Sequence, residues 1–244
     1  MSMLAADAPA RQNEAPTAEV LKLLKDEDSC KAIEFIQSLG EPAKVAEAYS
    51  NLVQGLYEKK NVAAMITIGR AGVQFCLTIA QQLAKSDEKK SAWFRQNAQV
   101  MSFNLAANCW PGWGEEGIVL SPADLAFGFD MARLDLRLAT EMKYPLLKLS
   151  NSNWIAGAHC MAAGKYADAL AWFGKSRQHA EEAKAADQAE MVKGYAGITE
   201  ILAGKEEGKA HFAAALEKLK ASKGEDAKFF ADQIQSVLKV FTGK

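Results

Sequence analysis

The stretch from Gly157 to Gly164, GAHCMAAG, is matched forty residues further on by GITEILAG, which runs from Gly197 to Gly204. In both copies the two glycines stand seven residues apart, and an aromatic residue precedes them. The second glycine of each copy is followed by a new stretch with helical spacing. A pattern that recurs at a period of roughly 20 to 50 residues is typical of stacked helical hairpins. The repeat therefore predicts an array of paired helices.

The composition of the 244-residue chain also favours helices. Proline is rare, with six residues, and alanine is abundant. Alanine loses no side-chain entropy in a helix, whereas proline interrupts the backbone hydrogen bonds. No segment shows sustained two-residue alternation, so no sheet is expected. The sequence predicts an all-α fold, a right-handed array of roughly four to five helical hairpins with a C-terminal capping helix.

Breaks at glycine, proline and polar residues divide the chain into elements. Residues 1–16 are interpreted as a flexible leader, and residues 17–244 as a single helical-repeat domain. Ser121, Pro122 and Asp124 are residue types that cap and begin a helix. The last helix has one apolar stripe and one polar face, as expected of an element that closes an exposed core. A first short helix is expected to begin at Thr17. Further helices are expected over 32–39, 42–60, 62–84, 87–109, 122–142, 146–163, 165–185, 187–203, 205–221 and 224–242.

The charges of the chain exclude a typical nucleic-acid binder. The 29 basic and 30 acidic residues give a formal net charge of −1. Proteins that bind nucleic acid usually present a basic stripe, because neutralising phosphates supplies much of the affinity. The densest basic clusters, at 59–60 and 89–90, have acidic residues around them and are interpreted as solvated helix ends. We expect no nucleic-acid partner.

Catalytic motifs are not found in the sequence. It contains no Ser-x-x-Lys, Gly-x-Ser-x-Gly, His-Glu-x-x-His or phosphate-binding glycine-rich loop. His159 and His179 are interpreted as packed or surface residues, and Asp130 and Arg133 stand at a spacing that supports a helix. An unrecognised acid–base site over 130–137 or at His159 is the alternative. We expect no enzymatic activity and no cofactor.

The cysteines and histidines do not show the spacing of a metal site. The cysteines form no C-x-x-C pair. Three of them sit among apolar helical neighbours and are expected to behave as small buried hydrophobes, although the even number of cysteines leaves a disulfide framework open. The histidines have no zinc-ligand spacing among themselves or with a cysteine. No metal site is expected. These residues are Cys30, Cys76, Cys109, Cys160, His159, His179 and His211.

The chain has no run of eighteen apolar residues, so no membrane span is expected. Met1–Ala10 lacks the charged start and apolar stretch of a secretory signal, which favours a cytoplasmic protein. The same segment also resembles what remains beside a small-residue cleavage site. An exported or periplasmic protein, with a signal peptide removed upstream of residue 1, is therefore the alternative.

The segment from Asn153 to Ser176, NWIAGAHCMAAGKYADALAWFGKS, resembles a tetratricopeptide repeat. That family places a large and then a small residue on its first helix, a Gly-x-Tyr turn, and small and aromatic residues on its second helix. The matching positions are Trp154, Gly157, Gly164, Tyr166, Ala169, Phe173 and Ser176.

The resemblance weakens along the rest of the chain. A second repeat, over about 190–222, matches at Gly197, Gly204 and Ala213 but has Glu206 where the family has its turn tyrosine. Residues 42–84 match weakly, and residues 87–143 match only as a helix pair with an insertion. The forty-residue interval exceeds the usual tetratricopeptide length, which implies longer helices or a different subfamily.

The resemblance implies that ligands bind in a concave groove lined by the first helix of each pair. Some family members clamp a peptide carboxylate there with lysine, asparagine and arginine. Trp154, Ile155 and Ala158 stand at those places here, so no such clamp is expected. The implied groove is apolar and suits a partner with hydrophobic anchors. Its predicted lining residues are Asn151, Trp154, Ile155, Ala158, Met161, Tyr195 and Ile198.

The segment from Asn108 to Gly117 contains two tryptophans, Trp110 and Trp113, within four positions of each other. They have two interpretations. They can plug the open end of a hairpin and bury a large apolar area. Alternatively, they are exposed anchors for a partner, since tryptophan is enriched among interface hot spots. We include both residues among the candidate binding residues.

Together these observations predict a non-enzymatic module that binds a protein or peptide, as a scaffold or adaptor. The alternative is a small-molecule or lipid binder with a pocket between helices near Trp110, Trp113 and Met161. Neither the partner nor an oligomeric state follows from the sequence.

Overall fold

The structure is a computed structural model, and it describes residues 14–26 and 28–243. The predicted leader, residues 1–16, therefore lies mostly outside the described residues. Within the described ranges the chain folds into α-helices and one short 3-10 helix, with no strand. The expectation of an all-α fold is confirmed.

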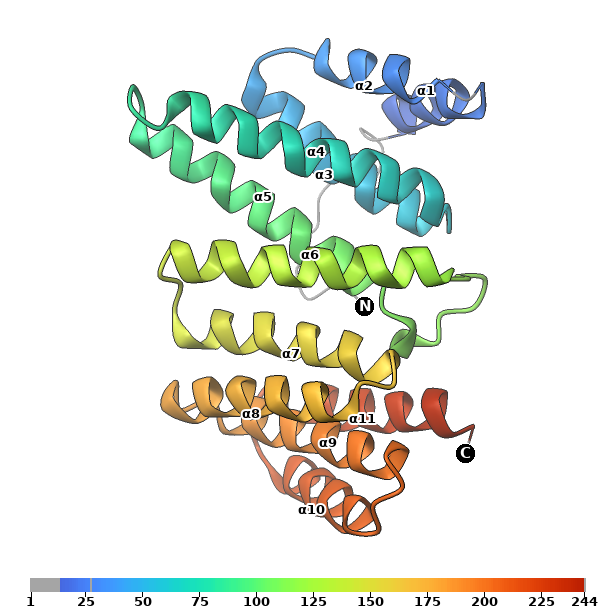
Figure 1. The fold of residues 1–244 in the computed structure, drawn as a ribbon, viewed down its shortest axis with the longest axis vertical. Helices are drawn as coiled ribbons and strands as arrows, with labels where there is room; N and C mark the ends of the chain where they lie inside the picture. Colours follow the sequence, from blue (N-terminus) through green and yellow to red (C-terminus); the bar gives the residue numbers. More distant parts are fainter. Residues whose placement is uncertain (1–13, 27, 244) are drawn as a thin grey trace. The chain divides into compact units, whose positions relative to one another are not determined.

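In the described part of the chain, eleven α-helices follow one another (Figure 1). They are α1 (Glu14–Lys25), α2 (Ser29–Gln37), α3 (Pro42–Glu58), α4 (Val62–Leu83), α5 (Glu88–Asn108), α6 (Pro122–Glu141), α7 (Leu146–Ala162), α8 (Tyr166–Glu182), α9 (Ala186–Leu202), α10 (Glu207–Ala221) and α11 (Ala227–Thr242). The 3-10 helix η1 (Pro111–Trp113) lies between α5 and α6.

The predicted helix ranges are confirmed closely from α3 onward, and two local predictions are corrected. Helix α1 begins at Glu14, so Thr17 lies inside it and is buried rather than capping it. Directly after Trp110, the residues Pro111–Trp113 form η1, a short element for which no helix was expected. At the start of α6 the predicted cap is confirmed: Ser121 Oγ accepts from the backbone N–H of Asp124 at 3.2 Å, and Asp124 Oδ2 accepts from that of Ser121 at 2.8 Å.

The chain divides into two compact units, residues 1–101 and 102–244, and the boundary falls within α5. The expectation of a single helical-repeat domain over 17–244 stays a prediction. The boundary between the units leaves no mark in the sequence pattern, because α5 runs through it as one continuous helix.

Unit 1, residues 1–101, is built on the pair formed by α3 and α4. Gly72 of α4 permits their close approach, because a β-carbon at this position would lie 2.8 Å from Cβ of Tyr49 in α3. Helix α4 is long and apolar enough to span a membrane by length and composition alone. Within unit 1 its Met65 and Ile68 are fully buried, so these apolar residues form the core of the unit.

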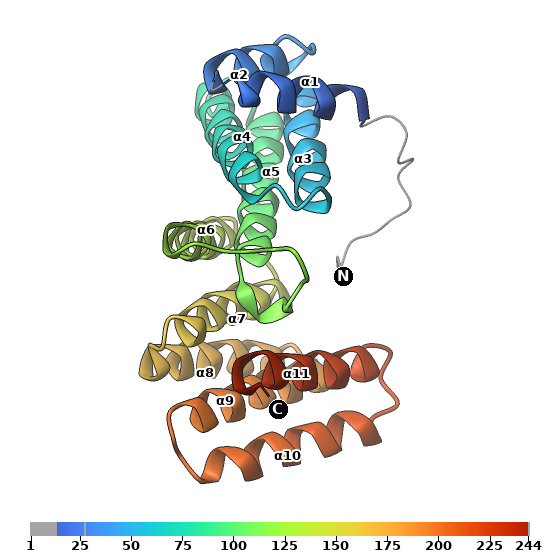
Figure 2. The same ribbon diagram turned by 90° about the vertical axis from the view of Figure 1, so that its right-hand side faces the viewer.

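Unit 2, residues 102–244, contains the hairpins α7/α8 and α9/α10, which contact each other through α8 and α9. Helix α6 packs on α7, and α11 packs on α9, on α10 and on η1. Figure 2 shows α11, in dark red, beside α9. A hydrophobic core cluster of buried residues lies in this unit.

One turn geometry recurs after five helices: α3, α6, α7, α8 and α9. In each, a residue in the left-handed region follows the helix, and the next backbone N–H bonds to a carbonyl five residues back. For example, Lys165 N–H donates to Cys160 O, and Lys205 N–H to Glu200 O, both at 2.9 Å. This pattern is the Schellman motif, which satisfies carbonyls left free at a helix end. The left-handed residues are Lys60, Lys143, Gly164, Lys184 and Gly204.

Gly157 and Gly197, the first glycines of the sequence repeat, occupy equivalent positions in the two hairpins. A β-carbon on Gly157 of α7 would lie 2.7 Å from Cε1 of Phe173 in α8. One on Gly197 of α9 would lie 2.7 Å from the backbone nitrogen of Phe212 in α10. Each glycine therefore permits close approach of the second helix of its own hairpin. The sequence repeat corresponds to a structural repeat.

Candidate functional site

The residues predicted to line an open groove lie largely in the core of unit 2. Asn151 and Trp113 are half-buried. The others are at most 6% exposed, namely Trp110, Trp154, Ile155, Ala158, Met161, Tyr195 and Ile198. The prediction of an open groove is therefore corrected. These residues are buried because η1 and α11 pack over the first helices of the two hairpins. A repeat pattern in the sequence does not show this packing.

Trp110 lies at the centre of an aromatic cluster. Its ring centroid lies 4.8 Å from that of Trp113, 6.1 Å from Trp154, 5.9 Å from Tyr195 and 6.3 Å from Phe241. The indole N–H of Trp110 donates to Ala158 O at 3.0 Å. The interpretation of Trp110 as a buried plug is confirmed, and its interpretation as an exposed anchor is wrong.

Helix α11 covers the surface that Trp110, Gly114, Trp154, Gly194 and Tyr195 form, which we call the α11-binding face. Two of its glycines make room for side chains of α11. A β-carbon on Gly194 would lie 2.7 Å from Cδ1 of Ile234, and one on Gly114 would lie 2.6 Å from Cγ2 of Val240. The sequence pattern marked Trp110, Trp154 and Tyr195 but missed both glycines, because nothing local to either one identifies what packs on it.

Three polar atoms meet beneath α11. The indole of Trp154 and the carboxamide of Gln233, from α11, both lie beside the hydroxyl of Tyr195. Trp154 Nε1, Tyr195 OH and Gln233 Oε1 are buried, yet none forms a hydrogen bond of good geometry with another described residue. Burial raises the pKa of Tyr195 well above its usual value, so the phenol remains neutral. The α11-binding face thus combines apolar contacts with a group of buried polar atoms.

Asn151, another predicted groove residue, has a structural role in joining α7 to α9. Its Oδ1 accepts from Gln188 Nε2 at 2.8 Å. At the neighbouring position, Asp187 Oδ1 accepts from the hydroxyl of Ser222 at 2.6 Å. The second bond ties the start of α9 to the linker that leads from α10 into α11.

The candidate acid–base residues lie on two helices, with Asp130 to Arg137 on α6 and His159 on α7. His159 is 4% exposed, and its Nε2 lies 2.9 Å from Ala106 O. Burial lowers the pKa of His159 to about 4, so the neutral ring donates this hydrogen bond near neutral pH. The interpretation of His159 as a packed residue is confirmed. In α6, Asp135 is buried, whereas Asp130 and Arg137 are exposed, and Arg137 pairs with Glu141 at 3.8 Å.

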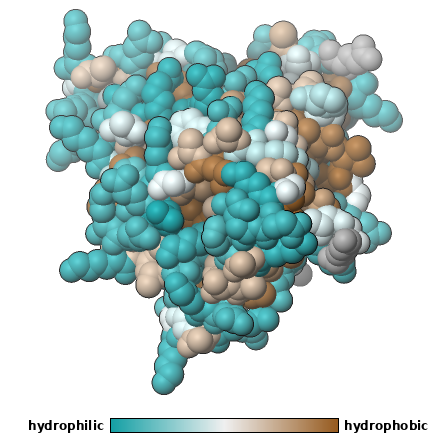
Figure 3. Space-filling view, turned by 60° about the horizontal axis from the view of Figure 1, so that its bottom comes forward, coloured by the Kyte–Doolittle hydropathy of each residue, from teal (hydrophilic) through white to brown (hydrophobic). Residues whose placement is uncertain are grey.

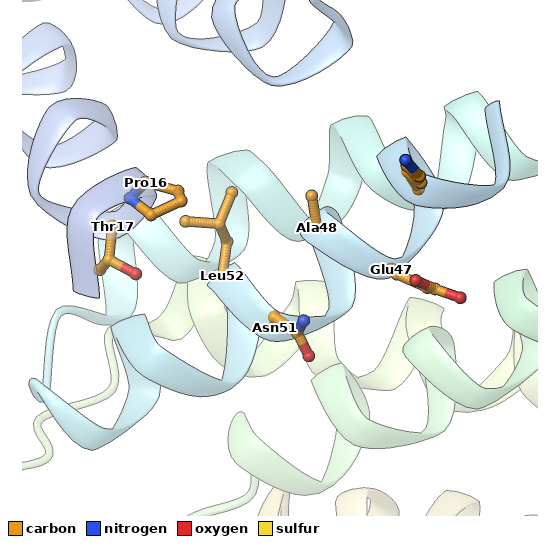
Figure 4. Close-up of a pocket in the computed structure, with 7 residues that line it drawn as sticks. Pro16, Thr17, Glu47, Ala48, Asn51 and Leu52 are labelled. Carbon is orange, nitrogen blue, oxygen red and sulfur yellow. The ribbon is translucent and has the colours of Figure 1, made fainter. Parts of the chain in front are cut away.

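Unit 1 has a small hollow between α1 and α3 (Figure 4). Its volume is about 140 Å³, below the roughly 300–1,000 Å³ typical of ligand pockets. Pro16 and Thr17 contribute from α1, and Asn51 and Leu52 contribute from α3. Its lining mixes apolar, polar and oppositely charged side chains without a convergent set of polar groups.

Across residues 14–26 and 28–243, no group of three or more histidine, cysteine, aspartate and glutamate side chains is placed to hold a metal ion. The four cysteines are free thiols. Burial raises the pKa of Cys76 and of Cys109 to about 12, which keeps both protonated. The end of unit 2 seen in Figure 3 is mostly hydrophilic, with smaller apolar areas between the polar residues.

No protein-family model matches the sequence. A search of curated proteins finds no significant match either.

Proposed function

We propose that this chain is a non-enzymatic module that binds a protein or peptide, built as a tetratricopeptide-like superhelix of helical hairpins. Support comes from the turn geometry that recurs after five helices and from the equivalent positions of Gly157 and Gly197. Arrays of this kind act mainly through extended surfaces that bind other chains.

The observation on which the function rests is the α11-binding face. It holds an amphipathic helix through apolar side chains, with Ile234 against Gly194 and Phe241 against Trp110. Recognition of a helix by an apolar face is a common mode of peptide binding, with anchors spaced at three, four and seven residues. We propose that the partner presents a helix with hydrophobic anchors to this face. The balanced charge of the chain does not favour a nucleic-acid partner.

Affinity capture with the tagged full-length chain, at native salt and from lysate of the cells that produce it, tests this function. A captured partner is then identified, purified and mixed with the chain for hydrogen-exchange mass spectrometry. Partner binding is expected to change the protection of amides in α7, α9 and α11. Recovery of no partner, or protection confined to residues 14–101, would contradict the proposal.

A further inference from the structure

Helix α11 has the anchor pattern of a ligand helix. Phe230, Ile234 and Val237 are buried, and Phe241 is half-buried against the ring of Trp110. These residues follow one another at spacings of four, three and four, which places them on one face of a helix. The opposite face is exposed and polar, with Asp232, Gln235, Ser236 and Lys239.

The surface beneath α11 is shaped to accept a helix. Gly194 lies under the buried Ile234, and a β-carbon there would clash with it; Gly114 lies against Val240, which is 40% exposed. The ring of Trp110 packs against those of Trp154 and Tyr195 and against Phe241 of α11. A buried apolar side chain over a glycine, beside aromatic rings, resembles the interface of a helix bound to a partner.

Buried polar atoms also lie at this interface. The indole of Trp154 and the carboxamide of Gln233, from α11, both lie beside the hydroxyl of Tyr195. A carboxylate or an amide oxygen at the Gln233 position is a hydrogen-bond acceptor, whereas the phenol and the indole N–H are donors. A bound helix therefore fits this place best with an acceptor at the Gln233 position.

The linker before α11 keeps this helix tethered near the α11-binding face, including when α11 is displaced from it. Residues 222–226 join α10 to α11, and Ser222 holds the start of the linker to Asp187. Gly224 lies so close to Asp187 that a β-carbon there would clash with its carboxylate. Anchoring at Ser222 leaves α11 tethered beside the α11-binding face, where a tethered segment has a high effective concentration.

We propose that α11 is an internal occupant of the α11-binding face and regulates access to it. A partner's amphipathic helix binds when α11 leaves, with apolar anchors at the positions of Phe230, Ile234, Val237 and Phe241 and a hydrogen-bond acceptor facing Tyr195 and Trp154. This regulation rests on the proposed function, because it concerns the same face.

A disulfide between α11 and η1 provides the test in the full-length chain. A β-carbon on Gly114 would lie 3.9 Å from Cβ of Val240, within the roughly 3.5–4.5 Å that a disulfide spans. The locked variant is therefore Gly114→Cys with Val240→Cys, made with Cys30→Ser to remove the exposed native thiol. The probe is a fluorescently labelled peptide that copies residues 227–242, and its binding is measured by fluorescence anisotropy.

The reduced locked variant is expected to bind the peptide at least about tenfold more tightly than the oxidised form, because only the reduced form populates an open face. A peptide with aspartate at the position of Ile234 should bind neither form. Equal binding by the oxidised and reduced forms would overturn the proposal. This comparison uses one variant in two redox states, so the strain that its substitutions introduce at the left-handed Gly114 is present in both measurements.

A variant in which the packing of α11 is weakened supplies a second measurement. Ile234→Asp removes an anchor and is expected to strengthen peptide binding at least about tenfold over the unmodified chain. Ser236→Asp adds the same charge on the exposed face of α11 and should leave binding unchanged. Failure of Ile234→Asp to strengthen binding, with helical circular dichroism retained, would also overturn the proposal.

Partner capture separates this proposal from the proposed function. Peptide exchange without any captured partner would support regulation by α11 and contradict the partner-binding function. A partner captured equally well by the oxidised and reduced locked variants would leave the binding function intact and overturn regulation by α11.

Discussion

Gly197 and Phe212 bring the backbones of α9 and α10 into direct contact. A β-carbon on Gly197 would lie 2.7 Å from the backbone nitrogen of Phe212 and 2.9 Å from its Cα. At Gly157, by contrast, the nearest atoms belong to the ring of Phe173, which a rotation of the side chain can displace. Gly197 is therefore the more demanding of the two repeat glycines, because a backbone cannot move without moving its helix.

Replacing Gly197 with alanine should lower the free energy of unfolding by about 2–3 kcal/mol, since the new methyl group forces α9 and α10 apart. Gly174→Ala is the matched control, because nothing lies within 4 Å of a β-carbon at this helical position. The control should raise the free energy of unfolding by up to about 1 kcal/mol through helix propensity. Urea unfolding followed by circular dichroism checks both values, and equal effects of the two substitutions would contradict the close approach.

Lys184 adopts a left-handed backbone at the turn between α8 and α9, with φ of 59°. A non-glycine residue in this region costs roughly 1–2 kcal/mol. Lys184→Gly should therefore raise the free energy of unfolding by about 1 kcal/mol, after the greater freedom of glycine in the unfolded chain is included. Gly204→Ala, at the equivalent turn after α9, should lower it by a similar amount. Thermal melts report both changes, and a lower melting temperature for Lys184→Gly would show that the lysine side chain stabilises the turn.

The stability of unit 2 should depend on pH through His159. Its pKa is about 4 in the folded chain and 6.5 in the unfolded one, so between these values the unfolded state binds more protons. The contribution of the neutral ring is complete above pH 6.5 and is lost as the pH falls towards 4. The loss amounts to about 3 kcal/mol. Urea titrations at several pH values measure it.

His159→Gln keeps a donor for Ala106 O and removes the ionisable group, so it should flatten this pH dependence. If the variant and the unmodified chain lose stability in parallel between pH 6.5 and 4, the dependence belongs to other groups.

Tyr195→Phe should leave the free energy of unfolding unchanged or raise it by up to about 1 kcal/mol, because the hydroxyl is buried without a well-formed hydrogen bond. Ser176→Ala provides the contrast. Ser176 Oγ donates to Ser150 O at 2.8 Å, and Ser150 Oγ donates to Ser176 O at 2.9 Å. Removing one partner of this buried pair should lower the free energy of unfolding by about 1–3 kcal/mol. A loss of similar size for Tyr195→Phe, measured by chemical denaturation, would show that the phenol is paired in solution.

Much of the fold followed from local patterns. Ser121 and Asp124 form the capping box that their spacing predicts, since a cap involves only neighbouring residues. Gly164 and Gly204 end their helices for the same local reason, and the apolar periodicity placed the helices from α3 onward. The division into two units left no such mark, because a boundary inside a helix changes long-range contacts but not helical spacing.

The sequence by itself determined the helices, their turns and the amphipathic character of α11, because these depend on residues within a few positions of one another. Only the tertiary structure decided what α11 packs against. The identities of Trp154 and Tyr195 do not reveal whether another helix covers them. They are buried because α11 packs over them across a long separation in sequence, with Ile234 against Gly194 and Gln233 beside Tyr195. Those contacts turn a predicted open groove into a face already occupied by the chain's own helix.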